Sequence, residues 1–193
     1  MFKIPGKILS ILLIASSILP IVDAKISLSK GDDVVFVGAG MGSRMIHYGH
    51  FETEIYLHHS DLNLKIRNLC DEGNTPGFRP HPSRNQEEQY AFPGAKDLIH
   101  DSLKAGTKPK GHFPTPDQWL SDLHAEVVLC FFGFNSSFDG PKQANRFKKE
   151  LGAYIKHLKS MSFGQNTPLI ALISPTAVET IPGITDGQSQ NRN

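Results

Sequence analysis

Two apolar runs that each stop at a glycine constrain the fold of this chain most. Residues 34–37 read Val-Val-Phe-Val before Gly38, and residues 127–132 read Val-Val-Leu-Cys-Phe-Phe before Gly133. Short, continuously apolar runs are typical of strands buried on both faces of a parallel sheet, because a half-exposed strand alternates polar and apolar residues. Each glycine then begins a loop at the carboxyl edge of the sheet, where open α/β folds keep their sites.

Strands and helices are predicted to alternate along the chain. The segment 74–114, rich in Pro, Gly and charge, predicts a long loop with one short helix. Thr115, Pro116 and Gln118 form a capping-box pattern that predicts the start of the next helix. This alternation favours a parallel sheet covered on both faces, a three-layer α/β/α fold. The predicted strands are 32–37, 62–69, 125–132 and 169–173, and the predicted helices are 43–58, 95–104, the one that begins at Thr115, and 141–161.

The N-terminus has the pattern of a secretory signal peptide. Basic residues precede an apolar run over 8–22, and small residues follow at Val22 and Ala24. This pattern predicts cleavage after Ala24, with export of the protein to the periplasm or the extracellular space. A membrane anchor is the alternative, but the run is short for a span. With 1–24 removed, the part 25–193 is expected to form one domain.

Charge and cysteine content exclude several classes of function. The chain has 20 Lys and Arg against 19 Asp and Glu, so we expect neither a nucleic-acid partner nor an anionic membrane surface. No later apolar run is long enough to span a bilayer. Export permits a disulfide between Cys70 and Cys130, whereas the apolar surroundings of Cys130 favour a buried free thiol. No Cys and His spacing predicts a metal site or a cofactor.

Three short blocks at predicted strand ends resemble those of the SGNH (GDSL-type) hydrolase family. They are Phe-Val-Gly-Ala-Gly at 36–40, Asn-Leu-Cys-Asp-Glu-Gly at 68–73 and Gly-Phe-Asn-Ser at 133–136. The resemblance extends over about 32–180 and implies a flavodoxin-like α/β/α fold. It also implies hydrolysis of acyl or acetyl esters of carbohydrate or lipid, with a small ester or a glycan as the ligand.

The resemblance also assigns site residues, and here the chain departs from the family. Gly40 stands at the position of the nucleophilic serine, and Gly73 and Asn135 match the donors of the oxyanion hole. The family's Asp-x-x-His block, together with a fifth strand and a final helix, has no counterpart after 169–173. The sheet is therefore expected to stop at the fourth strand, and the site to lack both nucleophile and base.

Each of these residues also has an ordinary structural interpretation. Ser43, three residues beyond Gly40, is either a substitute nucleophile near a helix N-terminus or simply the N-cap of that helix. Asn135 and Gly73 are equally suited to turns at strand ends.

Other polar residues have both a functional and a structural interpretation. A histidine group on the first predicted helix is expected to form a surface face rather than a metal site. Charged residues in the Pro-rich loop either meet an anionic group of a ligand or are solvated, and Glu179 follows the last strand near the same edge. The histidines are His47, His50, His58 and His59, and the loop residues are Arg79, His81 and Arg84.

Three hypotheses for function follow. The first is an exported ester hydrolase, impaired in this chain by the glycine at 40. The second is a catalytically inactive domain of the same fold that binds a glycan or a protein partner through its cleft. The third is a fragment with no independent function.

Overall fold

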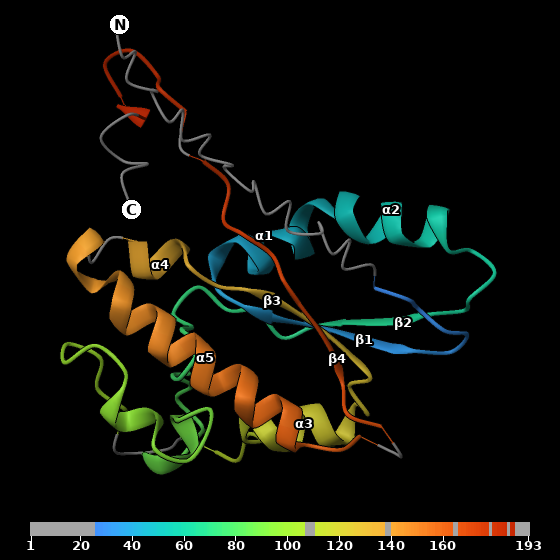
Figure 1. Cartoon of the computed structure of the whole chain (residues 1–193), viewed down its shortest axis with the longest axis horizontal. Helices are drawn as coiled ribbons and strands as arrows, with labels where there is room; N and C mark the ends of the chain where they lie inside the picture. The colour runs from blue at the N-terminus through green and yellow to red at the C-terminus, as the bar shows by residue number, and fades with distance from the viewer. Residues whose placement is uncertain are drawn as a thin grey trace, which may run out of the picture.

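A four-stranded sheet forms the middle layer of the structure, and every pair of neighbouring strands is parallel (Figure 1). The strands follow the order β2-β1-β3-β4 across the sheet. They are β1 (Asp33–Gly38), β2 (Lys65–Asn68), β3 (Val127–Phe131) and β4 (Leu169–Leu172). The predicted parallel sheet is therefore confirmed, with β2 shorter than the predicted 62–69 because only 65–68 pairs with β1.

This computed structural model describes residues 26–106, 111–137, 140–163, 166–177, 179–184 and 186–187. The predicted signal peptide over 1–24 lies outside the described residues. Among the helices of the described part, none combines the length and the apolar character that crossing a bilayer requires.

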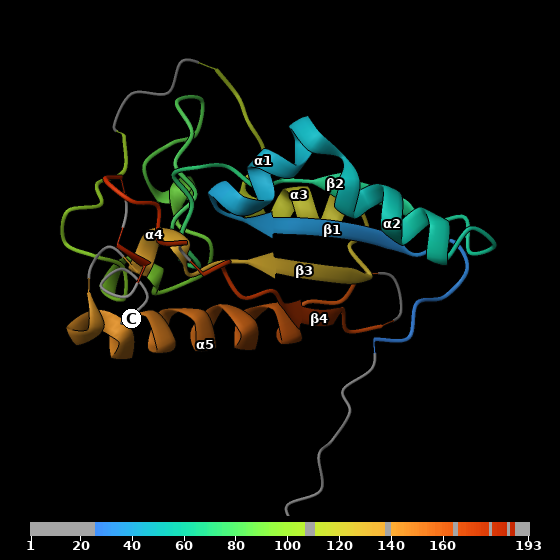
Figure 2. The ribbon, with the colours of Figure 1, turned by 90° about the horizontal axis from the view of Figure 1, so that it is seen from above.

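Helices cover both faces of the sheet, which gives three layers. Figure 2 shows α1 (Gly40–Tyr48) and α2 (His50–His58) on one side and α5 (Ala144–Ser160) on the other. Helix α3 (Pro116–Asp122) contributes Leu120 to the same core as α5. Two cores result, one on each face, because successive strand residues point to opposite sides.

The two central strands are buried on both faces, as the apolar runs predict. Val34 and Phe36 belong to the core beneath α1 and α2, and Val35 and Val37 belong to the core beneath α3 and α5. Phe36 also packs against Phe131 of β3, with ring centroids 5.3 Å apart. These strands fix the position of the loops that follow them.

The first predicted helix, 43–58, is in fact two helices. Gly49 separates α1 from α2, with φ of 59°, and its N–H donates to the carbonyl of Met45 at 2.9 Å. A left-handed residue of this kind ends a helix, and glycine adopts it without penalty. The apolar spacing continues across the break, so periodicity alone did not reveal it.

Helix α3 begins as its sequence predicts. The Thr115 hydroxyl accepts from the Gln118 N–H at 3.2 Å, and the Gln118 side chain accepts from the Thr115 N–H at 2.8 Å. Pro116 occupies the first helical position. The capping box is therefore confirmed.

In its described residues, the segment between β2 and α3 contains two short helices. They are the 3-10 helices η1 (Glu87–Gln89) and η2 (Ala95–Asp97), so the predicted helix 95–104 extends no further than Asp97. Buried Glu150 of α5 holds the start of this segment, because its carboxylate accepts from the Thr75 hydroxyl at 2.5 Å and from the Gly77 N–H at 2.7 Å.

The connection from β3 to α5 also differs from prediction. Helix α4 (Phe134–Ser137) follows β3 directly, and the 3-10 helix η3 (Pro141–Gln143) precedes α5. The predicted helix over 141–161 therefore begins as an α-helix only at Ala144. Gly133, with φ of 117°, makes the turn from β3 into α4.

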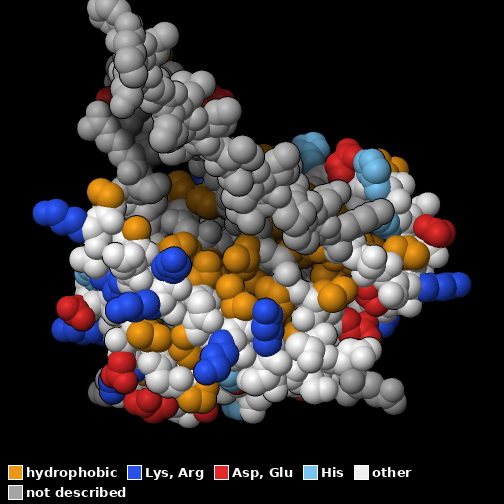
Figure 3. Space-filling view, viewed as in Figure 1, with side chains coloured by type: hydrophobic (Ala, Val, Ile, Leu, Met, Phe, Trp, Pro, Cys, Tyr) orange, Lys and Arg blue, Asp and Glu red, His pale blue; other side chains and the backbone are white. Residues whose placement is uncertain are grey.

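Strand β4 forms one edge of the sheet and is more exposed than the central strands. Leu169 and Leu172 are 46% and 52% exposed. Hydrophobic side chains gather on this side of the molecule (Figure 3).

Both cysteines are free, which excludes the disulfide that export would permit. Cys70 belongs to the core beneath α1 and α2, and Cys130 belongs to the core on the other face of the sheet. Burial raises the pKa of each thiol to about 12.

Candidate functional site

Glycine is required where β1 turns into α1. A Cβ at Gly38, where φ is 155°, would lie 2.4 Å from the backbone oxygen of Phe131 on the neighbouring strand. A Cβ at Gly42 would lie 2.3 Å from the sulfur of Cys70. The first approach brings the end of β1 against β3, and the second brings the first turn of α1 against the loop that follows β2.

A cavity of about 430 Å³ opens where this turn meets α4. Its wall combines residues from the start of α1, the loop after β2, α4 and the segment after β4, namely Gly40, Met41, Arg44, Glu72, Phe134, Asn135 and Thr176. The structure thus brings Gly40 and Asn135 to one cavity, here called the edge cavity. Gly73 lies in a neighbouring cavity of about 240 Å³ that Asn135 also lines.

Gly40 leaves open space where the resemblance implies a nucleophile. A Cβ at this position would meet no atom within 4 Å, in contrast to Gly38 and Gly42. A side chain would therefore fit here without displacing its neighbours.

Ser43 does not supply the missing hydroxyl to the edge cavity. It lies inside the first turn of α1, where its hydroxyl donates to the carbonyl of Gly40 at 3.1 Å, and it does not line the cavity. The N-cap is Ala39, so the interpretation of Ser43 as the N-cap is wrong. The helix begins three residues earlier than predicted because the glycines at 40 and 42 take helical conformation.

The side-chain amide of Asn135 holds two loops together. Its Nδ2 donates to the carbonyl of Glu72 at 2.5 Å and to that of Asn74 at 3.3 Å. Asn74 in turn donates from its own Nδ2 to the carbonyl of Gly38 at 3.1 Å. Both N–H bonds of Asn135 are therefore engaged with backbone, which leaves neither to stabilise an oxyanion in this arrangement.

Gly73 lies in the loop that Asn135 holds. Within the described parts of the chain its N–H has no acceptor, and a Cβ here would come 3.3 Å from Pro80. The position thus presents a free backbone donor, although it faces the neighbouring cavity rather than the edge cavity.

The charged residues of the edge cavity are solvated. Arg44 and Glu72 approach to 3.9 Å, but their side chains are 74% and 72% exposed, so the pair adds little to stability. None of the described residues that line this cavity is a histidine. Glu179 is exposed and does not line it either.

The histidine group on α1 and α2 forms a surface face, as predicted. His47, His50 and His58 are exposed, and His59 is half-buried. Among the described residues, no three His, Cys, Asp or Glu side chains lie together in a way that could hold a metal ion.

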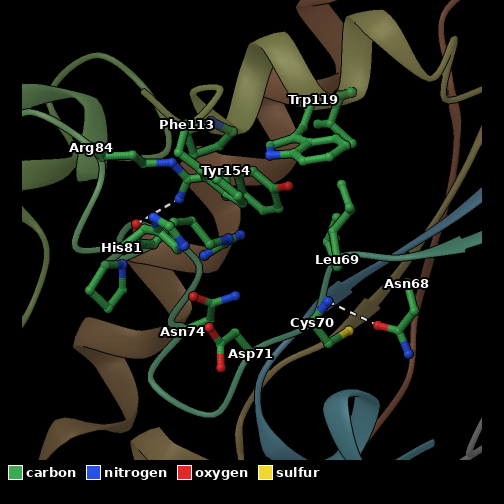
Figure 4. Close-up of a pocket in the computed structure, with 15 residues that line it drawn as sticks. Asn68, Leu69, Cys70, Asp71, Asn74, His81, Arg84, Phe113, Trp119 and Tyr154 are labelled. Carbon is green, nitrogen blue, oxygen red and sulfur yellow. Dashed lines mark hydrogen bonds between the residues drawn. The ribbon is translucent and has the colours of Figure 1, made fainter. Parts of the chain in front are cut away.

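The loop residues Arg79 and Arg84 differ most from the sequence-based expectation. The sequence left two interpretations open, contact with an anionic group of a ligand or solvation, and solvation is wrong because both side chains are buried, at 5% and 7% exposure. They line a further cavity at the carboxyl edge, drawn in Figure 4, that sequence reasoning missed. The only signal in the sequence was the position of this loop directly after the second block.

Comparison of the chain with protein-family models, with curated proteins and with solved structures found no match.

Proposed function

We propose that this chain is a catalytically inactive ligand-binding domain with the architecture of an SGNH-type hydrolase. The observation that carries the proposal is the edge cavity itself. It has the backbone of Gly40 where an attacking hydroxyl would stand, and the amide of Asn135, the expected oxyanion donor, is engaged with two carbonyls. A serine hydrolase needs both a nucleophile and free donors for the oxyanion.

Two features support the architectural part of the proposal. The strand order β2-β1-β3-β4 agrees with the first four strands of the flavodoxin-like order. The loops after β1 and β3 also reach one cavity at the carboxyl edge, where the family keeps its site.

The wall of the edge cavity suits a hydroxyl-rich ligand such as a glycan. Arg44 and Glu72 offer exposed donors and acceptors, and the first turn of α1 has no side-chain cap on its N–H groups. Phe134, which is 40% exposed, adds an aromatic surface against which the apolar face of a sugar ring can pack. A glycan is therefore the ligand class that we propose, with a protein partner as the alternative.

An ester hydrolysis assay tests the loss of catalysis. Purified protein is incubated with 4-nitrophenyl acetate, and we expect no release of nitrophenol above that of buffer. Asn135→Ala is the diagnostic variant, since removal of an oxyanion donor lowers turnover about 10²- to 10³-fold in an active enzyme. Turnover by the wild-type protein that Asn135→Ala abolishes, with circular dichroism unchanged, would favour the impaired-hydrolase hypothesis instead.

A glycan array tests the ligand class. We expect the wild-type protein to retain a subset of neutral oligosaccharides, and Phe134→Ala to lose them. Arg67→Gln is the matched control, because Arg67 is exposed on β2 and does not line the edge cavity. Equal retention by Phe134→Ala, or no retention by the wild-type protein, would contradict a glycan site here.

A further inference from the structure

The cavity that Arg79 and Arg84 line is separate from the edge cavity. It has a volume of about 290 Å³ and lies between the loop after β2, the loop that carries the two arginines, and helix α3 (Figure 4). Val37 lines it from β1, so it belongs to the α3 and α5 face of the sheet. This volume lies just below the usual range for small-molecule sites, about 300–1,000 Å³, so the site suits a small ligand.

Arg79 is buried without a partner for its charge. Its guanidinium lies over the rings of Phe132 and Tyr154, at 4.6 and 5.1 Å from their centroids, and Nη1 donates to the carbonyl of Phe78 at 3.4 Å. The other terminal nitrogen, Nη2, is buried and has no hydrogen-bond partner among the described residues. The two rings stand at 89° to each other with centroids 5.8 Å apart, so they lie on adjacent sides of the guanidinium and do not cover both of its flat faces.

An unpaired buried guanidinium donor is costly. A buried donor left unsatisfied costs about 1–3 kcal/mol, and more when it is charged. Within the described residues no carboxylate forms an ion pair with Arg79 or Arg84. A ligand that carries a negative charge would therefore satisfy Nη2 and balance the buried charge together.

Arg84 adds a second positive charge to the same cavity. Its Nε donates to the carbonyl of Pro114 at 2.7 Å and its Nη1 to that of Arg79 at 2.8 Å, which holds the side chain in place. Burial, followed by the charge of Arg79, lowers the pKa of Arg84 to about 10, against the opposing effect of Glu88 and Asp71. Arg84 therefore remains charged at neutral pH.

The net charge of the lining favours a ligand with a single negative charge. Asp71, an exposed carboxylate, lines the cavity beside the two arginines and offsets one of their charges. Burial, followed by the charge of Arg84, lowers the pKa of His81, so His81 adds no charge at neutral pH. Two guanidinium groups and one carboxylate leave a net charge of about +1, which one anionic group of a ligand neutralises.

The remaining wall is aromatic. His81 stacks on Phe113, with centroids 3.7 Å apart and planes 12° apart, and Phe113 packs against Trp119 at 5.6 Å. Figure 4 shows these three side chains, with Arg84, around the same space. Flat rings of this kind pack well against a flat apolar ligand.

Taken together, the geometry points to a binding site for a small monocarboxylate with a flat apolar body, held by Arg79 and Arg84 at its carboxylate and by Phe113 and Trp119 along its body. A carboxylate is planar and accepts hydrogen bonds at two oxygens, which matches the edge of a guanidinium. The site goes beyond the proposed function, because it shares none of its residues with the edge cavity.

Trp119 makes the site directly observable, because it is the only tryptophan of the chain and lines the cavity. Benzoate is titrated into the full-length protein while tryptophan fluorescence and the heat of binding are recorded. Benzamide serves as the neutral probe of the same shape, and inorganic phosphate as an anion without an apolar body. We expect benzoate to bind at least about tenfold more tightly than benzamide, since a hydrogen bond to a charged group contributes about 1.5–3 kcal/mol.

Two variants and one control decide the assignment. Arg79→Gln is expected to weaken benzoate binding at least about tenfold. Asp71→Asn is expected to tighten it about twofold to fivefold, because the substitution removes an exposed negative charge and keeps the oxygen that accepts from the Glu72 N–H. Arg67→Gln, an exposed arginine outside the cavity, should leave the affinity unchanged.

Each outcome either supports or overturns the assignment. Should Arg79→Gln fail to fold, Asp71→Asn still tests the charge of the site, because the side chain of Asp71 is exposed and its replacement should not disturb the fold. Equal affinity for benzoate and benzamide, tighter binding of phosphate than of benzoate, or an unchanged affinity in Asp71→Asn would overturn the assignment. Because neither the ester assay nor the glycan array reports on this cavity, its failure is distinguishable from failure of the proposed function.

Discussion

The glycines at 40 and 42 provide a matched test of how α1 packs. Both lie in the first turn of the same helix, yet a Cβ at Gly40 would meet nothing within 4 Å, whereas one at Gly42 would lie 2.3 Å from the sulfur and 3.0 Å from the Cβ of Cys70. We expect Gly40→Ala to be slightly more stable than the wild-type protein and Gly42→Ala to be clearly less stable.

The magnitudes follow from two opposing effects. Replacement of a glycine by alanine in a helix interior stabilises the protein by about 1 kcal/mol. At Gly40, in the first position of the helix, the expected gain is about 0.5 kcal/mol. At Gly42 the overlap with Cys70 adds an overpacking cost, about 3 kcal/mol at the upper end of the usual range. The net loss at Gly42 is then about 2 kcal/mol, so the two variants should differ by about 2.5 kcal/mol.

Urea unfolding followed by circular dichroism measures this difference. The urea midpoints of the two variants should differ by about 1 M, given the usual slope of the free energy of unfolding against urea concentration. Cys70→Ala in the Gly42→Ala background removes the sulfur and should recover part of the loss, which a double-mutant cycle detects as coupling. If Gly42→Ala unfolds at the same urea concentration as Gly40→Ala, α1 does not lie against the loop after β2 in the way described.

Two further predictions concern buried polar groups. Glu150→Ala should lower the free energy of unfolding by about 3 kcal/mol, because Thr75 and Gly77 lose their buried acceptor. Glu150→Gln should restore about half of this loss. Thermal unfolding measures both variants, and an unchanged stability of Glu150→Ala would contradict the anchoring role of Glu150. Burial raises the pKa of each thiol, Cys70 and Cys130, from its ordinary 9.0 to about 12 in the folded chain. Since the unfolded thiols ionise first, stability that is fully present below pH 9 should fall as the pH rises toward 12, by about 1.4 kcal/mol for each thiol between pH 8 and pH 10. Urea unfolding at both pH values measures this loss, and a loss that persists undiminished in the double alanine variant would show another cause.

The framework of the fold was predictable because its signals are local. The apolar runs at 34–37 and 127–132 predicted the two central strands, and the Thr115 capping box predicted the start of α3. Patterns of this kind involve only residues that are close together in the sequence, so they can be recognised without knowledge of the tertiary structure.

The features that were missed depend on partners far away in the chain. Arg79 belongs to a polar, proline-rich segment, which left solvation open as one interpretation, but its guanidinium is buried against Phe132 and Tyr154. Neither ring is near it in sequence. Likewise, Asn135 was predicted either as an oxyanion donor or as a turn former, and only its contacts with Glu72 and Asn74 show that it joins two loops.

The pairing of β1 with β3 has a consequence for how the chain reaches this structure. Val34 pairs with Val127, and Asp33 bonds to Glu126 across a separation of 93 residues. Closing a loop of that length costs about 4 kcal/mol of chain entropy, and this cost comes before the contacts between the two central strands can form. Folding is therefore expected to be slow for a chain of this size, with the helices formed well before the middle of the sheet is assembled.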